Sequence, residues 1–114
     1  MVGDFMAELL DNWGLQVALL RDPEAAVRWL SDPAHEVDVM ITDQTMPRMT
    51  GLQLAQRAAT LRPGLPVVLY TGDAAEFDAA LLQRSGVRQL LRKPIVPATL
   101  RTLMHALLAE AVAR

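Results

Sequence analysis

The sequence contains no cysteine, and aromatic residues make up only 4% of its 114 residues. The lack of cysteine excludes disulfide bonds and thiolate metal sites, and it suits a reducing compartment. No apolar run approaches the roughly 20 residues that a membrane-spanning helix needs. The N-terminus also lacks the basic region and long apolar core of a signal peptide. We therefore expect a cytoplasmic protein without a membrane partner, whose core is built from aliphatic side chains.

Neither sign of charge dominates the chain. Eleven basic and thirteen acidic residues give a net charge of -2, so no basic field is available to attract nucleic acid. Hydrophobic residues make up 52% and charged residues 21%, a composition typical of a globular domain. We expect a single domain over residues 1–114, because a chain of this length supports one core.

Helical patterns and short apolar segments alternate along the chain. Helical spacing, caps and start signals predict five helices, at residues 5–13, 22–32, 50–61, 77–85 and 97–108. Apolar segments predict four strands, at residues 15–20, 37–42, 67–70 and 87–92. This alternation predicts an α/β fold with a parallel sheet and right-handed crossovers.

Polar residues follow the last three predicted strands. Asp43 follows residues 37–42, Thr71 follows 67–70 and Lys93 follows 87–92. The carboxyl ends of parallel strands share one edge of a sheet, where open α/β sheets bind ligands. Taken singly, each residue also has an ordinary explanation as a loop acid, a helix cap or a solvated lysine. Together, a carboxylate, a hydroxyl and an ammonium suit the transient capture of a phosphoryl group.

Four sequence fragments in this order resemble the receiver domain of two-component response regulators. They are VMITDQTMP at residues 39–47, MTG at 49–51, LYTG at 69–72 and KP at 93–94. The resemblance covers essentially the whole chain. It implies a flavodoxin-like (CheY-like) doubly wound parallel sheet and a signalling domain that accepts a phosphoryl group, rather than an enzyme.

The resemblance also implies a role for each site residue. Asp43 would be the phosphoacceptor, taking the group from the phosphohistidine of a histidine kinase or phosphotransfer protein. Thr71 would donate a hydrogen bond to a phosphoryl oxygen. Lys93 would pair with the phosphoryl group or with Asp43, and the Lys93–Pro94 peptide would be cis. Mg²⁺ would bind the Asp43 carboxylate and the backbone carbonyl of Thr45.

The chain departs from the family in two places. Receivers begin with a central strand that ends in an acidic cluster, and this sequence starts at the following helix. Asp4 stands on that helix, in the wrong place to replace the missing acidic pair. Mg²⁺ prefers near-octahedral oxygen ligands, so we expect its binding here to be weak or absent. Leu90 replaces the aromatic residue that switches many receivers, which argues against that form of signalling.

The missing strand would lie between residues 15–20 and 37–42. An empty lane of about 10 Å, twice the usual strand spacing, would separate these segments. Unpaired strand edges favour association with other chains. Three explanations remain open: an N-terminally truncated form of a longer protein, which we favour; a homodimer in which a second copy completes the sheet; or a rearranged sheet.

Three functions follow from these observations. The first is a phosphoacceptor receiver in a phosphorelay, either stand-alone or, as we slightly favour, the C-terminal receiver of a hybrid sensor kinase. The second is a degenerate receiver that acts as a phosphorylation-independent interaction or dimerisation module. The third, a flavodoxin-like cofactor binder, is disfavoured because no Gly-rich phosphate loop follows the first predicted strand.

Overall fold

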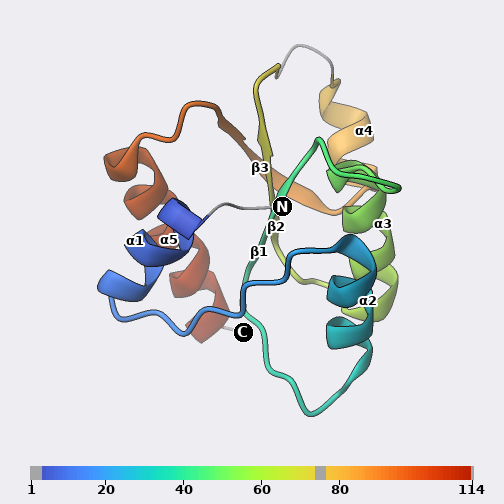
Figure 1. Cartoon of the computed structure of the whole chain (residues 1–114), viewed down its shortest axis with the longest axis horizontal. Coiled ribbons are helices and arrows are strands. Elements are labelled where there is room, and N and C mark those ends of the chain that lie inside the picture. The colour runs from blue at the N-terminus through green and yellow to red at the C-terminus, as the bar shows by residue number, and fades with distance from the viewer. Residues whose placement is uncertain (1–3, 74–76, 114) are drawn as a thin grey trace.

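The computed structural model describes residues 4–73 and 77–113, which form helices on both sides of a central sheet (Figure 1). The helices are α1 (Asp4–Asn12), α2 (Pro23–Ser31), α3 (Gly51–Leu61), α4 (Ala79–Arg84) and α5 (Pro97–Ala113). The strands are β1 (Met40–Asp43), β2 (Val67–Thr71) and β3 (Val87–Arg92).

The sheet is parallel throughout the described residues, with strand order β1-β2-β3. Asp43 at the end of β1 lies opposite Tyr70 of β2, and Thr71 lies opposite Arg92 of β3. The last residues of the three strands therefore meet at one edge of the sheet. The predicted α/β fold and shared edge are confirmed.

Two helical layers cover the two faces of the sheet (Figure 1). Helices α1 and α5 pack on one face, where Val68 of β2 joins Leu10 and Leu100 in one apolar cluster. On the other face, Val67 and Leu69 pack with Ala55 of α3. Side chains that alternate along β2 thus pack into both layers, as a strand covered on both faces requires.

The predicted helix starts are confirmed where the sequence supplies a side-chain cap. Asp22 accepts a hydrogen bond from the Glu24 amide at the start of α2, and Pro23 occupies the first turn. Thr50 and Gln53 form a reciprocal capping box at the start of α3. These caps fix the residues at which the preceding loops enter α2 and α3.

Four predicted boundaries or elements are wrong, among them the end of the last helix, which runs to Ala113 rather than to residue 108. Residues 15–20 form no strand, although their apolar sequence predicts one. The next strand begins at Met40 rather than at residue 37, and α4 begins at Ala79, which leaves Phe77 outside the helix. A strand needs a hydrogen-bonded neighbour, and no strand lies beside residues 15–20 within the described sheet.

The sheet does not close the gap that the sequence predicts. In the described part of the chain, β1 pairs with β2 alone. A cavity of about 600 Å³ lies between residues 15–20 and 37–42. The structure therefore contradicts a rearranged sheet. Truncation of a longer protein and completion of the sheet by a second copy stay predictions.

Gly51 allows the loop after β1 to approach the start of α3. A Cβ atom at this position would lie 2.3 Å from the backbone oxygen of Asp43 and 2.7 Å from Leu69 Cδ1. Only glycine fits this contact, because the backbone oxygen cannot move without shifting Asp43.

We expect Gly51→Ala to lower the free energy of unfolding by about 1–3 kcal/mol, measured by urea denaturation. The matched control is Gly72→Ala, since nothing lies within 4 Å of the added Cβ there. Equal stability of the two variants would contradict the steric account.

Candidate functional site

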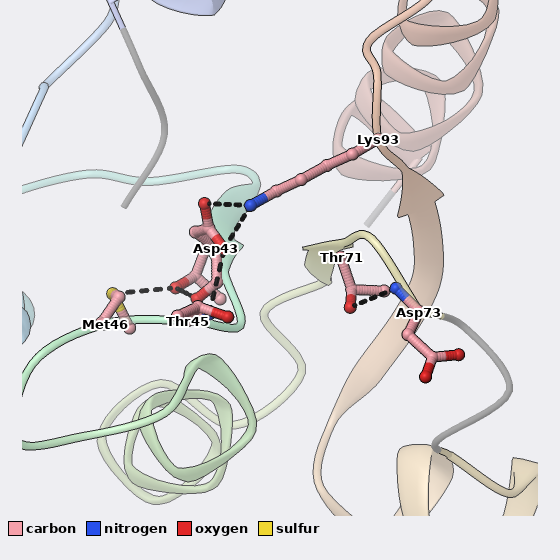
Figure 2. A network of polar contacts seen from close by, with 7 residues as sticks. Asp43, Thr45, Met46, Thr71, Asp73 and Lys93 are labelled. Atoms are coloured by element: carbon pink, nitrogen blue, oxygen red, sulfur yellow. Dashed lines mark hydrogen bonds and ion pairs between the residues drawn. The ribbon is translucent and has the colours of Figure 1, made fainter.

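Asp43 lies at the end of β1 with a mostly buried side chain that is 14% exposed. Its carboxylate accepts hydrogen bonds from two directions. Lys93 Nζ lies 2.8 Å from Oδ2 and 3.1 Å from Oδ1, and the Thr45 amide donates to Oδ1 at 3.0 Å. Figure 2 shows the lysine side chain reaching across the sheet edge to this carboxylate. The predicted pairing of Asp43 with Lys93 is present.

Lys93 is the first residue after β3 and is 37% exposed on its side chain. Its backbone amide donates to the Thr71 carbonyl at 2.9 Å, which continues the β2–β3 pairing past the strand end. The Nζ atom also lies 5.2 Å from the centroid of the Tyr70 ring. The Lys93–Pro94 peptide is cis, as the resemblance implies.

Thr71 lies at the end of β2 and is buried, with 4% exposure. Its hydroxyl oxygen accepts a hydrogen bond from the Asp73 amide at 3.2 Å. Within the described residues, no hydrogen bond joins this hydroxyl to Asp43 or Lys93, and Figure 2 shows it turned toward Asp73. The sheet thus brings Thr71 to the same edge without placing it in contact with the ion pair.

The loop after Asp43 is held by backbone contacts that the sequence reading missed. The Gln44 amide donates to the Tyr70 carbonyl, and the Gln44 carbonyl accepts from the Gly51 amide, both at 3.0 Å. The Gln44 side chain accepts from the Leu52 amide at 2.8 Å and so satisfies a free N–H in the first turn of α3. Gln44 therefore anchors the loop that carries Thr45.

Tyr70 is the second residue that sequence reasoning missed. It directly precedes Thr71, so the alternation of a strand turns its ring to the opposite face of β2. Its half-buried ring packs with the α1 and α5 cluster and lies beside the lysine ammonium. Because the attraction of a cation to an aromatic face is directional, Tyr70 helps to hold Lys93 over Asp43.

The donors at this edge do not fit Mg²⁺ well. Both carboxylate oxygens of Asp43 already accept hydrogen bonds. Lys93 donates to both of them, and the Thr45 amide donates to Oδ1. No group of three or more histidine or acidic residues that could hold a metal occurs within residues 4–73 and 77–113. Asp4 instead pairs with Arg21 at 2.8 Å on the exposed surface. A carboxylate and the Thr45 carbonyl leave most of an octahedral shell to water.

Comparison with known proteins assigns the family. The family model of the response regulator receiver domain matches residues 1–105. The chain belongs to this family. The match covers most of the sequence and agrees with the fold, so the receiver resemblance is confirmed.

Curated relatives include a sensor histidine kinase and a transcriptional regulatory protein. The chain is 33% identical over 90 residues to the sensor histidine kinase RcsC of Salmonella typhimurium, covering 79% of this chain and 9% of that protein. It is 35% identical over 61 residues to the transcriptional regulatory protein GlrR of Escherichia coli, covering 54% of this chain and 14% of that protein. The chain thus spans a small part of these relatives.

Solved structures share the fold. A receiver domain protein from Clostridium thermocellum superposes with a TM-score of 0.85 at 23% identity, covering 96% of this chain and 86% of the other. The receiver domain of the sensor histidine kinase PA1611 from Pseudomonas aeruginosa, solved with magnesium in its active-site cleft, gives 0.78 at 21% identity, covering 92% and 86%. The flavodoxin-like fold is therefore confirmed.

The structure also bears on membranes. Within the described residues, no helix combines the length and apolar character that crossing a bilayer demands.

The affinity for Mg²⁺ tests whether the oxygen donors at this edge are a poor fit for the metal. We expect isothermal titration to give a dissociation constant in the millimolar range or weaker, because the described residues hold no group of three or more acidic or histidine residues that could bind the metal. Ca²⁺ serves as a control for nonspecific binding by surface acids. A micromolar constant for Mg²⁺ that Asp43→Asn abolishes would contradict this reading.

A double-mutant cycle tests the contact between Tyr70 and Lys93. The variants are Tyr70→Leu, Lys93→Met and the pair, with Tyr70→Phe as the control that keeps the ring. We expect a coupling free energy of about 0.5–1 kcal/mol from urea denaturation, preserved when phenylalanine replaces tyrosine. A coupling indistinguishable from zero would show that the ring does not act on the ammonium.

Proposed function

We propose that this receiver domain accepts a phosphoryl group on Asp43 within a histidine-to-aspartate phosphorelay. The observation that carries the proposal is the contact of Lys93 Nζ with both carboxylate oxygens, at 2.8 and 3.1 Å. A carboxylate needs little activation as a nucleophile, so the protein must chiefly position it and neutralise the charge of the incoming group.

The transfer makes one bond and breaks one. An Asp43 oxygen attacks the phosphorus of a phosphohistidine, and the electron pair of the breaking P–N bond returns to the imidazole nitrogen. Lys93 would move from the carboxylate to the phosphoryl oxygens, where its ammonium offsets the developing negative charge. Thr71 would turn its hydroxyl from Asp73 toward a phosphoryl oxygen. Because the described donors do not fit Mg²⁺ well, neutralisation in this site rests mainly on Lys93.

The donor would be a histidine kinase or a histidine phosphotransfer protein. Similarity to the receiver part of RcsC supports placing this domain within a hybrid sensor kinase. The reaction with such partners would take place in the cytoplasm. No basic surface for nucleic acid is expected at a net charge of -2.

A second function is favoured by one specific observation. The described residues hold no metal-binding cluster, and Asp4 is engaged with Arg21. A receiver domain that does not bind the metal at this edge would act as an interaction module independent of phosphorylation. Partner binding by this module would survive Asp43→Ala.

Incubation with acetyl phosphate separates the two functions. We expect intact-mass spectrometry to show one added phosphoryl group per chain, absent in Asp43→Asn. Asp38→Asn is the matched control, because Asp38 is an exposed acid close in sequence. Lys93→Met should slow the reaction about 10²–10³-fold, the usual effect of losing one group that stabilises transition-state charge.

The same incubation can also reject phosphoacceptance. An unmodified wild-type chain at high acetyl phosphate, with or without Mg²⁺, would reject phosphoacceptance and leave the interaction module. Equal modification of the Asp43→Asn variant would place the phosphate elsewhere.

A further inference from the structure

Arg48 has an unusual backbone conformation in the loop that joins β1 to α3. Its φ is +69°, whereas the other positive φ values among the described residues belong to glycines. The Met49 amide donates a hydrogen bond to the Pro47 carbonyl at 2.8 Å, so Arg48 is the central residue of a tight three-residue turn. A positive φ at this position is the rare, strained form of the turn, which glycine adopts at less cost. Because such strain persists only where other contacts stabilise it, the contacts of the Arg48 side chain are informative.

The Arg48 side chain reaches the N-terminal end of α2. Its Nη2 atom donates to Asp22 Oδ2 at 3.2 Å, and its Nε atom lies 3.9 Å from Glu24 Oε1. The other oxygen of Asp22 caps α2 by accepting from the Glu24 amide at 2.8 Å. One carboxylate thus stabilises the helix start and holds a loop that lies 26 residues away in sequence. We call the contacts of Arg48 with Asp22 and Glu24 the loop clamp.

The loop clamp is exposed to solvent. The Arg48 side chain is 63% exposed, that of Asp22 39% and that of Glu24 57%. The neighbouring base Arg21 does not take the place of Arg48, because it pairs with Asp4 at 2.8 Å. Exposed ion pairs contribute little to the stability of a fold and are screened by salt. The loop clamp is therefore better suited to select one loop conformation than to stabilise the domain.

The loop clamp and the site share one loop. Gln44 anchors the start of this loop to β2 and α3, and the capping box of Thr50 fixes its end. Between these anchors, the Thr45 amide donates to Asp43 Oδ1 at 3.0 Å. Arg48 follows Thr45 by three residues, and its side chain ties this middle part of the loop to α2. A contact at this point restricts the backbone that carries the Thr45 amide.

We propose that Arg48 is a positioning residue for Asp43. Its ion pairs with Asp22 and Glu24 hold the Thr45 amide on the Asp43 carboxylate, and so keep that carboxylate oriented for attack on phosphorus. The effect on transfer rests on the proposed function, whereas the contact of Thr45 with Asp43 can be measured without it. Because salt screens exposed pairs, the loop clamp also makes the site sensitive to ionic strength.

Amide hydrogen exchange of Thr45, followed by NMR on the whole unphosphorylated chain, tests the loop clamp directly. Arg48→Gln should speed this exchange about threefold, the effect of losing two exposed ion pairs, and Arg48→Lys should change it less because lysine keeps the charge. Asp22→Asn with Glu24→Gln should match Arg48→Gln, because asparagine still caps α2. Arg57→Gln, at an exposed arginine of α3, is the control that should leave the exchange unchanged.

The rate of phosphorylation by acetyl phosphate tests the consequence for the site. Arg48→Gln should lower the maximal rate about threefold and leave the half-saturating concentration of acetyl phosphate unchanged, because it disturbs orientation rather than access. Roughly 0.5 M sodium chloride should reduce the difference between this variant and the wild type, since salt screens the pairs that the wild type retains. Arg57→Gln should again behave as the wild type.

Arg48→Gly separates positioning from stability. Glycine adopts a positive φ without strain, so the midpoint of urea denaturation should not fall below that of the wild type. The exchange of the Thr45 amide should nevertheless speed up and phosphorylation should slow, as in Arg48→Gln. An arginine with a purely structural role would move stability and rate in the same direction.

Two results would overturn the proposal. The first is a Thr45 exchange rate that stays at the wild-type value both in Arg48→Gln and in the variant of the two acids. The second is faster exchange with an unchanged rate of phosphorylation, which would leave the loop clamp without a role in positioning. A wild-type chain that accepts no phosphoryl group would reject the proposed function and with it the effect on transfer, while the exchange measurement still decides whether the loop clamp holds Thr45.

Discussion

The parallel pairing of β1, β2 and β3 is the constraint on which the site depends. It places the ends of three strands at one edge, so Asp43 and Lys93 meet although 50 residues separate them in sequence. The pairing continues past the strands, through the Gln44 amide to Tyr70 and the Lys93 amide to Thr71. Gly51 then lets α3 begin against the Asp43 carbonyl. The carboxylate and the ammonium are thereby positioned by backbone rather than by flexible side chains alone.

The same sheet is open on its β1 side. In the described part of the chain β1 pairs with β2 alone, and a cavity of about 600 Å³ lies along its other side. The edge that holds Asp43 lies at the carboxyl ends of the strands and is distinct from this open side.

Much of this arrangement follows from sequence. The alternation of patterns predicted the parallel fold, and the residues that follow the last three strands predicted that Asp43 and Lys93 lie at one edge. The resemblance to receiver domains implied that the two side chains pair. The strand expected at residues 15–20 failed because an apolar run reports burial but not a partner, and the hydrogen-bonded neighbour is lacking there. The roles of Gln44 and Tyr70 were not predicted, because Gln44 acts through contacts with β2 and the start of α3, and Tyr70 through its contact with Lys93. Periodicity in the sequence does not reveal such contacts. Thr71 lies at the predicted edge, but its hydroxyl oxygen accepts a hydrogen bond from the Asp73 amide. The sequence pattern does not determine this side-chain orientation.

We propose that Asp43, Thr71 and Lys93 act together on one phosphoryl group. The most direct measurement is amide NMR during titration with beryllofluoride, which mimics a phosphoryl group on a carboxylate. If the three residues act on one phosphoryl group, their signals should shift together and saturate together, and Asp43→Asn should abolish the response. Shifts confined to other regions, or a response that persists without the carboxylate, would contradict it.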